Sequence, residues 1–425
     1  MERYKEYKDS NIPWLKSLPS HWEEKRAKYI YEKQDRIPDE TDEVITCFRD
    51  GEVTLRKNRR TTGFTESLKE IGYQGIKKGD LVIHQMDAFA GATGVSDSDG
   101  KGTPVYSVCT PIDKQNLTQY HAKVIRLMGL NGFIQSLYRG IRERSSDFRF
   151  ETFARQLLPI PPLAEQEKIV SYLESKTSKI DAYVADKEKE IELLQELKQK
   201  TIAEAVTKGL NPNVKMKEYN SLISSQYPEH WKIMRNKTFL SLTGEKVGNR
   251  ANEYILLSLT TKGVIIRDME SGKGKFPKDF DTYQIVKQDD LVFCLFDIDE
   301  TPRTVGLVNT EGMITGAYTA LKVNKSIALP EYIYNYYLCV DDLKALKPYY
   351  SGLRKTVRAD KFLQLYLPLP PIDEQQAIVS YIEEKCQKID TLITELQAEI
   401  DYLKEYKQRL IADVVTGQVN VQKEG

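Results

Sequence analysis

The sequence has few of the residues that build covalent crosslinks, metal sites or membrane spans. Its five cysteines among 425 residues include no CxxC pair, and an odd, scattered set argues against a disulfide framework or a zinc site. No apolar run approaches the roughly 18 residues that span a bilayer, and the charged start MERYKEYKDSNIPWL is unlike a signal peptide. We therefore expect a cytoplasmic protein that makes no contact with a membrane.

An excess of either charge is also absent. The chain has 62 Lys and Arg against 62 Asp and Glu, which counts against a nucleic-acid binder unless the basic residues cluster locally. They do so in three places, although similar clusters are common on solvated surfaces. The clusters are Arg56, Lys57, Arg59 and Arg60; Arg139, Arg142, Arg144 and Arg149; and Arg354, Lys355, Arg358 and Lys361.

Catalytic motifs are missing as well. Gly94 and Gly100-Lys101 suggest a phosphate loop, but the spacing is one residue too long and Gly102 replaces the required Ser or Thr, so we expect a flexible loop. The four histidines lack metal-ligand spacing, and the two in matching His-Trp pairs favour packing. The acidic run Asp297, Asp299 and Glu300 could suggest a nuclease metal site, but the first half offers only Asp87 at the matching place, without a following Glu-x-Lys. We predict no catalytic, cofactor-binding or metal-binding residue.

An internal repeat is the strongest signal in the chain. The segment LPIPPLAEQ from Leu158 aligns with LPLPPIDEQ from Leu367 at a shift of 209 residues, without a gap as far as Thr207. Pro19-Ser-His-Trp22 matches Pro228-Glu-His-Trp231 at the same shift. Between these elements the two halves diverge. The chain is therefore a duplication of one helical region and one variable head.

Each repeat predicts a long helix. The pairs Pro161-Pro162 and Pro370-Pro371 suit a first helical turn, and acidic residues follow them. A stripe of apolar residues then recurs at helical spacing to about Lys208, a length of roughly 65–70 Å. So long a helix needs a partner, and we favour antiparallel pairing of the two repeats as a coiled coil over a helix that folds back on its own domain.

The heads mix short strand-like runs with turns and one helical stretch, Glu331–Leu346, so the chain belongs to the α+β class. Two α/β heads joined by two long antiparallel helices would be related by a pseudo-twofold axis. The expected strands are Glu43–Phe48, Asp80–Ile83, Tyr254–Leu259 and Asp290–Phe296. The expected domains are residues 1–158 and 211–367 for the heads and 159–210 and 368–425 for the helical spacers.

The duplicated P-[IL]-P-P-[LI]-x-E-Q element, followed by a long helix and paired with a P-x-H-W element, resembles the specificity subunit of type I restriction-modification systems. The resemblance covers essentially the whole chain. It implies two target-recognition domains that each read half of a bipartite, asymmetric DNA site. It also implies two modification subunits that bind S-adenosylmethionine and methylate adenine, and two restriction subunits that use ATP and Mg²⁺. This chain itself would hold no cofactor.

On this interpretation two sets of residues are candidate sites. Basic residues of the heads are expected to meet DNA: Arg56, Lys57, Arg59, Arg60, Arg142, Arg144, Arg354, Lys355 and Arg358. The repeated helix starts are expected to dock the partner subunits: Pro161, Pro162, Glu165, Gln166, Pro370, Pro371, Glu374 and Gln375. Outward-facing repeat positions such as Ile169 and Ile378 are further docking candidates if they face the partner.

Two other classes of function stay open. The neutral net charge also fits a coiled-coil scaffold that binds protein, not DNA, at its two heads. Duplex binding that weakens steeply as salt rises would separate a DNA reader from such a scaffold. A stand-alone endonuclease would cleave DNA with Mg²⁺ alone, whereas a specificity subunit would need its partners.

Overall fold

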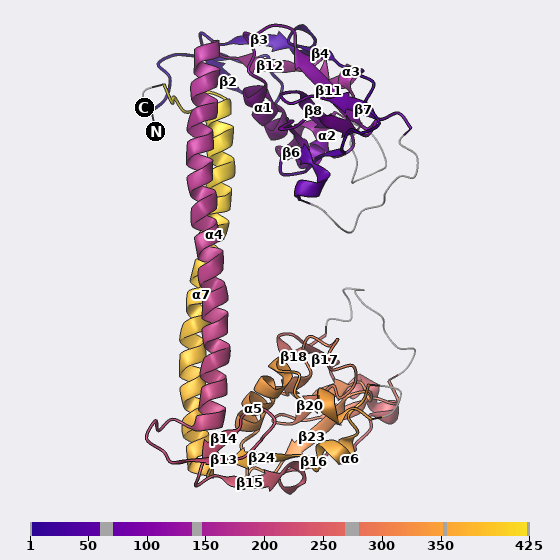
Figure 1. Ribbon diagram of the computed structural model, residues 1–425, viewed down its shortest axis with the longest axis vertical. Helices are drawn as coiled ribbons and strands as arrows, with labels where there is room; N and C mark the ends of the chain where they lie inside the picture. Colours follow the sequence, from indigo (N-terminus) through magenta and orange to yellow (C-terminus); the bar gives the residue numbers. More distant parts are fainter. Residues whose placement is uncertain (1, 60–70, 138–146, 268–279, 352–354, 423–425) are drawn as a thin grey trace. The chain divides into compact units, whose positions relative to one another are not determined.

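The computed structural model describes residues 2–59, 71–137, 147–267, 280–351 and 355–422 (Figure 1). The chain divides into two compact units. Unit 1 consists of Met1–Lys187 and Ala398–Gly425, and unit 2 of Glu188–Gln397. Each unit therefore contains one head and one part of each long helix.

The two long helices are α4, Leu163–Lys208, and α7, Ile372–Val415. Both begin directly after the paired prolines, whose missing N–H groups would have no partner in a first turn. At the end of α4, Gly209 adopts a positive φ of 72°, the left-handed conformation that commonly terminates a helix. The predicted helix starts and the predicted end near Lys208 are confirmed.

Within each unit the two helices run antiparallel. In unit 1, Asp181 of α4 pairs with Lys407 of α7 at 2.6 Å and, further along α4, Lys187 pairs with Glu399 at 3.6 Å. In unit 2, Lys198 pairs with Asp390 at 2.7 Å. Residue numbers thus rise along α4 as they fall along α7. The seam between the helices is apolar, with Val184, Ile202, Ile389, Leu396, Ile400 and Leu410 all buried.

The head of unit 1 is a small mixed fold around a four-stranded antiparallel sheet with the order β4-β11-β8-β9. Helix α1 packs against β9 and the η3 turn. Its elements are β1 Tyr7–Asp9, β2 Ser17–Pro19, β3 Glu23–Arg26, η1 Ala27–Tyr29, β4 Tyr31–Lys33, β5 Ile45–Cys47, β6 Val53–Leu55, η2 Arg56–Asn58, β7 Gln74–Ile76, β8 Leu81–His84, η3 Ala88–Ala90, β9 Thr93–Val95, β10 Gly100–Gly102, β11 Tyr106–Pro111, α1 Thr118–Leu130, α2 Phe133–Ser136, α3 Phe150–Phe153 and β12 Leu157–Ile160.

The head of unit 2 repeats this plan with the sheet order β16-β23-β20-β21. Strand β20 pairs with β23 as β8 pairs with β11. Its elements are β13 Met216–Glu218, β14 Gln226–Pro228, β15 Lys232–Arg235, η4 Asn236–Thr238, β16 Leu240–Leu242, η5 Gly248–Glu253, β17 Leu257–Thr260, β18 Gly263–Ile266, β19 Gln284–Val286, β20 Leu291–Phe293, β21 Val305–Leu307, β22 Gly312–Ile314, β23 Thr319–Val323, α5 Pro330–Asp342, η6 Lys347–Tyr349, α6 Ala359–Phe362 and β24 Tyr366–Leu369.

Each head shares its hydrophobic core with both long helices. In unit 1, Trp22 and Tyr120 pack with Ile169 of α4 and with Val414 of α7. Unit 2 repeats the arrangement with Trp231, Tyr332, Val206 and Ile378. Ile169 and Ile378 are fully buried, so they face the head cores and the interpretation of these two residues as partner-facing positions is wrong.

The glycine-rich segment that we expected to be a flexible loop is instead ordered strand. Gly94 lies in β9 and Gly100–Gly102 forms β10, paired with β7. A Cβ atom on Gly94 would lie 1.9 Å from the carbonyl oxygen of Gly51. Close packing between backbones, and not phosphate binding, therefore explains this glycine. All five cysteines are present as thiols, and no described helix combines the length and apolar character needed to cross a bilayer.

Candidate nucleic-acid interface

In the first head, the predicted DNA-contacting residues follow the β5–β6 hairpin. The guanidinium of Arg59 lies 2.7 Å from carboxylates of both Asp50 and Glu52, and 4.2 Å above the ring of Phe48. The Lys57 ammonium lies 2.5 Å from Glu43, and Arg56 belongs to the short η2 helix. Lys57 and Arg59 thus lie directly after the hairpin, and each is beside a carboxylate. Arg60 lies outside the described residues.

In the second head, Lys355 is the centre of a similar cluster. Its ammonium lies 2.7 Å from Glu300 and 3.3 Å from Asp299. The hydroxyl of Tyr350 donates to Asp299 at 2.8 Å, which lowers the pKa of that carboxyl. Arg358 lies 3.1 Å from Asp360. The acidic run that could have suggested a metal site is therefore partnered by Lys355 and Tyr350.

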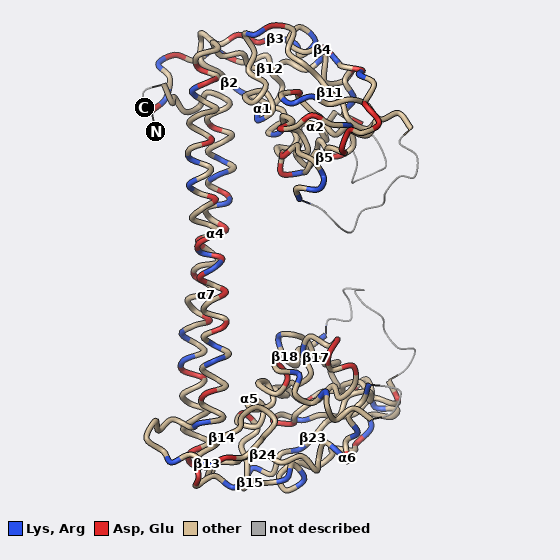
Figure 2. The backbone as a smooth tube through the Cα atoms, viewed as in Figure 1, with Lys and Arg blue, Asp and Glu red and all other residues tan. Residues whose placement is uncertain are grey.

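Two parts of the expected interface cannot be compared with these clusters. Arg142 and Arg144 of the first head and Arg354 of the second head lie outside the described residues. Over the described residues, basic and acidic segments alternate along α4, α7 and both heads (Figure 2). Four of the described cationic candidates lie beside carboxylates and so belong to regions of mixed charge.

The second predicted set, at the helix starts, forms a repeated junction between head and helix. In unit 1, β12 pairs with β3 so that Ile160 lies opposite Glu23, which brings the preceding His21-Trp22 pair beside the start of α4. The carboxylate of Glu165 accepts hydrogen bonds from Trp22 Nε1 at 2.9 Å and from Tyr4 Oη at 3.1 Å, and it contacts His21 Nε2 at 2.7 Å.

Unit 2 builds the same junction from the repeated residues. Glu374 accepts a hydrogen bond from Trp231 Nε1 at 3.1 Å and contacts His230 Nε2 at 2.7 Å. The strand pair β15–β24 replaces β3–β12. The histidines of the His-Trp pairs were expected to serve packing, but their side chains are 46% and 47% exposed and each contacts the glutamate carboxylate. Their common carboxylate partner was missed, although the two motifs recur at one shift and so keep the same separation in both halves.

The glutamine that follows each glutamate is fully buried. The Gln166 side-chain oxygen accepts from Leu117 N at 2.8 Å, at the start of α1, while its amide nitrogen donates to the Pro161 carbonyl at 2.8 Å. Gln375 makes the same bonds to Leu329 N and the Pro370 carbonyl, at 2.8 and 2.9 Å. With no exposed surface, neither glutamine reaches a partner in this conformation. Their observed contacts fasten the helix start to its head.

Burial shifts the pKa of several ionisable groups in the interior. Burial raises the pKa of Cys47 to about 12 and that of Cys339 to about 12, so both stay thiols, the unreactive form. Burial lowers the pKa of His121 to about 3. Among the residues that the structure describes, no three His, Cys, Asp or Glu side chains come together as metal ligands.

This chain is similar in sequence to proteins of known family. Residues 236–402, from the second head into α7, match the family model described as a type I restriction modification DNA specificity domain. Over these residues the chain is similar to a type I DNA specificity domain. The putative MjaX specificity subunit of Methanocaldococcus jannaschii is 22% identical over 277 residues, covering 62% of this chain and 59% of that protein. The EcoBI specificity subunit of Escherichia coli is 23% identical over 329 residues, covering 71% and 65%.

The fold of the chain is similar to that of two solved chains. One solved chain, from a study of complex assembly and conformational transition of the type I R-M system, has a TM-score of 0.66 at 14% identity, covering 95% of this chain and 99% of that chain. The HsdS subunit from Thermoanaerobacter tengcongensis gives a TM-score of 0.52 at 15% identity, covering 95% and 98%. The chain spans between 59% and 65% of the length of the curated relatives it matches.

Proposed function

We propose that this chain is the DNA-reading subunit of a type I restriction-modification complex, in which each head reads one half of a bipartite, asymmetric site. The observation that carries the proposal is the pairing of one repeated junction with two different heads. Equivalent glutamates and glutamines fasten both heads, whereas the loops that the heads present differ in sequence. The same junction between head and helix, combined with different loops in each head, suits a protein that reads two different DNA sequences.

Contact with DNA would use the paired cations of the heads. Exposed ion pairs contribute about 0–1 kcal/mol, so Lys57, Arg59, Lys355 and Arg358 could exchange their carboxylates for DNA phosphates at little cost. Arg56 is proposed to join them, together with the residues outside the described part of the chain: Arg60, Arg142, Arg144 and Arg354. Such contacts position the protein on the duplex, while side chains in the divergent loops would read base edges.

Docking of two modification subunits is supported by exposed apolar positions that recur in both repeats. In unit 1, Tyr402 is 66% and Tyr406 36% exposed. Their equivalents in unit 2, at a shift of 209 residues, are Leu193 and Leu197, 56% and 49% exposed. Each pair is spaced by four residues and so lies on one face of its helix. We propose that these two faces each dock one methyltransferase subunit.

Catalysis and cofactors would reside in the partners. The modification subunits would bind S-adenosylmethionine, and two restriction subunits would use ATP and Mg²⁺. The purified chain alone is then expected neither to methylate nor to cleave DNA. Turnover of S-adenosylmethionine by the chain without its partners would overturn this part of the proposal.

DNA reading is tested by measuring binding of duplexes to the complex of this chain with its modification subunits as salt increases. A reader that neutralises several phosphates loses affinity steeply, and Lys57→Ala or Lys355→Ala should each reduce the salt slope by about one unit. A flat salt dependence would instead favour a scaffold that binds protein at its heads. Sequencing of methylated host DNA with and without the gene would give the half-sites.

Docking is tested by mass measurement of the assembled complex at saturating methyltransferase. The double variant Tyr402→Glu with Tyr406→Glu should leave one partner bound, and so should Leu193→Glu with Leu197→Glu. All four substitutions together should abolish assembly. Two partners retained by both double variants would place docking elsewhere.

A further inference from the structure

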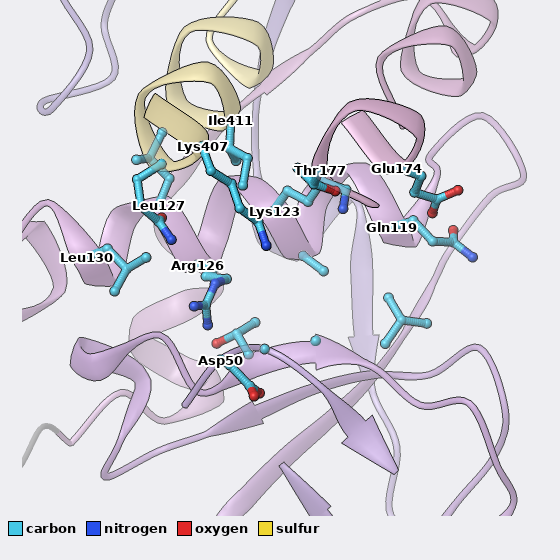
Figure 3. A pocket seen from close by; sticks show the side chains of 16 residues that line it. Asp50, Gln119, Lys123, Arg126, Leu127, Leu130, Glu174, Thr177, Lys407 and Ile411 are labelled. Atoms are coloured by element: carbon cyan, nitrogen blue, oxygen red, sulfur yellow. The ribbon is translucent and has the colours of Figure 1, made fainter. Parts of the chain in front are cut away.

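A cavity of about 290 Å³ lies in unit 1 between the head and the two long helices. Helix α1 contributes Lys123 and Arg126, α7 contributes Lys407, and α4 contributes Glu174 (Figure 3). The turn at Asp50, between β5 and β6, closes the remaining side. None of these residues belongs to the three basic clusters named from the sequence, because the residues around the cavity come from four separate segments of the chain.

Arg126 is held rigidly in the cavity wall. Its Nη1 donates to the carbonyl oxygen of Gly91 at 2.6 Å and to that of Arg49. A Cβ atom on Gly51, which has a φ of +92°, would lie 3.1 Å from the Arg126 side chain, so the glycine leaves room for the arginine. No carboxylate among the described residues forms an ion pair with this guanidinium. Its Nε and Nη2 make no hydrogen bond within that part of the chain.

Lys123 is the second cation of the cavity and is half-buried. Within the described ranges it makes neither a hydrogen bond nor an ion pair, and Glu174 acts on it only from beyond ion-pair distance. Burial lowers the pKa of Lys123, because the ammonium gives up hydration without gaining a partner. An anion in the cavity would compensate for this loss.

The remaining charges around the cavity are already balanced. Asp50 lies 2.7 Å from Arg59, and Lys407 lies 2.6 Å from Asp181. The charge of Asp50 acts on Arg126 and that of Glu174 acts on Lys123. Three cations and two carboxylates line the cavity, which leaves one positive charge in excess. A guanidinium fork beside a compact ammonium is a combination that suits a phosphate group, since the fork binds two oxygens and the ammonium a third.

The cation pair is present in one unit only. Tyr120 of α1 and Tyr332 of α5 occupy equivalent places, because each donates its hydroxyl to a carbonyl of a long helix, at 2.8 Å to Val415 and at 3.1 Å to Val206. Three and six residues further along, α1 has Lys123 and Arg126 where α5 has Asn335 and Leu338. The two units therefore share the packing of this helix against the long helices, but differ in the charge of the side chains at these two positions.

We propose that the cavity binds the phosphate group of a small ligand, such as a mononucleotide, in unit 1 alone. Its volume is close to the lower end of the range for ligand pockets, about 300–1,000 Å³, which accommodates a phosphate with a small organic group. Because its walls come from α1, α4 and α7, a bound anion would tie the head to both long helices. This site is separate from the proposed contact with DNA.

The full chain, without DNA or partner subunits, is the material for the test. Inorganic phosphate and adenosine monophosphate are each titrated at constant ionic strength against chloride, with the melting temperature and calorimetric binding as readouts. Either ligand should raise Tm, because it binds only the folded state. Lys123→Gln should weaken binding about tenfold or more, as expected for loss of one charge-assisted hydrogen bond.

The matched control is Lys179→Gln, which removes the same charge from an exposed position on α4 and should leave binding unchanged. Lys123→Gln removes no hydrogen bond or ion pair among the described residues, so without phosphate it should melt at or above the temperature of the parent chain. Equal phosphate effects in the parent and in Lys123→Gln would overturn the proposal. Loss of duplex binding by Lys123→Gln with no effect of either small anion would also overturn it, and would assign the cavity to backbone phosphates.

Discussion

At the scale of single residues, the most informative side chain is the glutamate that begins each long helix. Its carboxylate accepts hydrogen bonds that a neutral amide could not all accept, because an ionised carboxylate offers only acceptors. Burial, together with Glu165, raises the pKa of the Tyr4 hydroxyl well above its ordinary value, so the tyrosine stays a donor. The motif EQ therefore has a physical reason: Glu binds the P-x-H-W element and Gln binds the start of the head's helix.

Glu165→Gln and Glu374→Gln should both loosen the junction, by about 1–3 kcal/mol for each carboxylate. The larger loss is expected for Glu165, which contacts three side chains where Glu374 contacts two. Hydrogen exchange of residues 17–26 and 228–235 reports each junction separately. Glu167→Gln, an exposed neighbour, is the control, and exchange that stays slow in both junction variants would contradict this account.

His121 should make unit 1 acid-sensitive. The buried imidazole has a pKa of about 3 in the folded chain against 6.5 for an ordinary histidine. The unfolded chain therefore binds one more proton than the folded chain between these values, so stability is complete above pH 6.5 and falls as pH decreases toward 3. His121→Gln should flatten the acid-dependent loss of Tm in unit 1. An unchanged pH profile in this variant would show that other groups control the transition.

At the scale of elements, the long helices could be predicted and the sheets could not. Helix starts depend on local residues, the paired prolines and the acidic first turn, and the apolar stripe repeats every turn. The strands have three to six residues, too few for a clear alternating pattern. Four predicted strand runs do overlap β5, β8, β17 and β20, and the predicted Glu331–Leu346 helix overlaps α5.

The pairing of the strands could not be predicted from the sequence. Strand β11 pairs with both β4 and β8, from segments far apart in the chain, and no local pattern records such a register. The same holds for the charges. Lys355 was predicted to be a basic contact, but its carboxylate partners come from a loop 55 residues earlier. The sequence thus indicated which residues are basic and not which of them are already paired.

Two of the ion pairs between α4 and α7 are copies of each other, and this gives a test of the helix pairing. Lys198–Asp390 in unit 2 and Lys407–Asp181 in unit 1 exchange partners under the repeat shift of 209 residues. Asp390→Lys should destabilise unit 2 by about 0.2–1 kcal/mol, as for other exposed pairs. Adding Lys198→Asp should restore most of that loss. Thermal unfolding of the four members of this cycle gives the coupling energy, and a coupling of zero would argue against direct pairing.

At the scale of the whole molecule, the long helices are proposed to determine the gap between half-sites. Seven residues inserted after Lys187 in α4 and after Gln397 in α7 would add one heptad to both helices and keep the apolar seam in phase. The added length of about 10 Å corresponds to about 3 base pairs. Sequencing of methylated DNA should then find unchanged half-sites with a longer gap. Altered half-sites with an unchanged gap would refute the helix as spacer.

The first and last described residues lie beside each other in unit 1 (Figure 1). The backbone N–H of Asn420 donates to the Glu2 carbonyl at 2.9 Å, and the Tyr7 hydroxyl donates to the Gly417 carbonyl at 2.8 Å. The equivalent place in unit 2 is the continuous segment that follows Gly209. A circular permutant that joins the present ends through a short linker and opens between Asn211 and Asn213 should therefore fold with the parent's Tm and exchange pattern. In such a molecule the two heads would follow each other in the opposite order along the chain, so a gene that encodes either head first could specify the same fold.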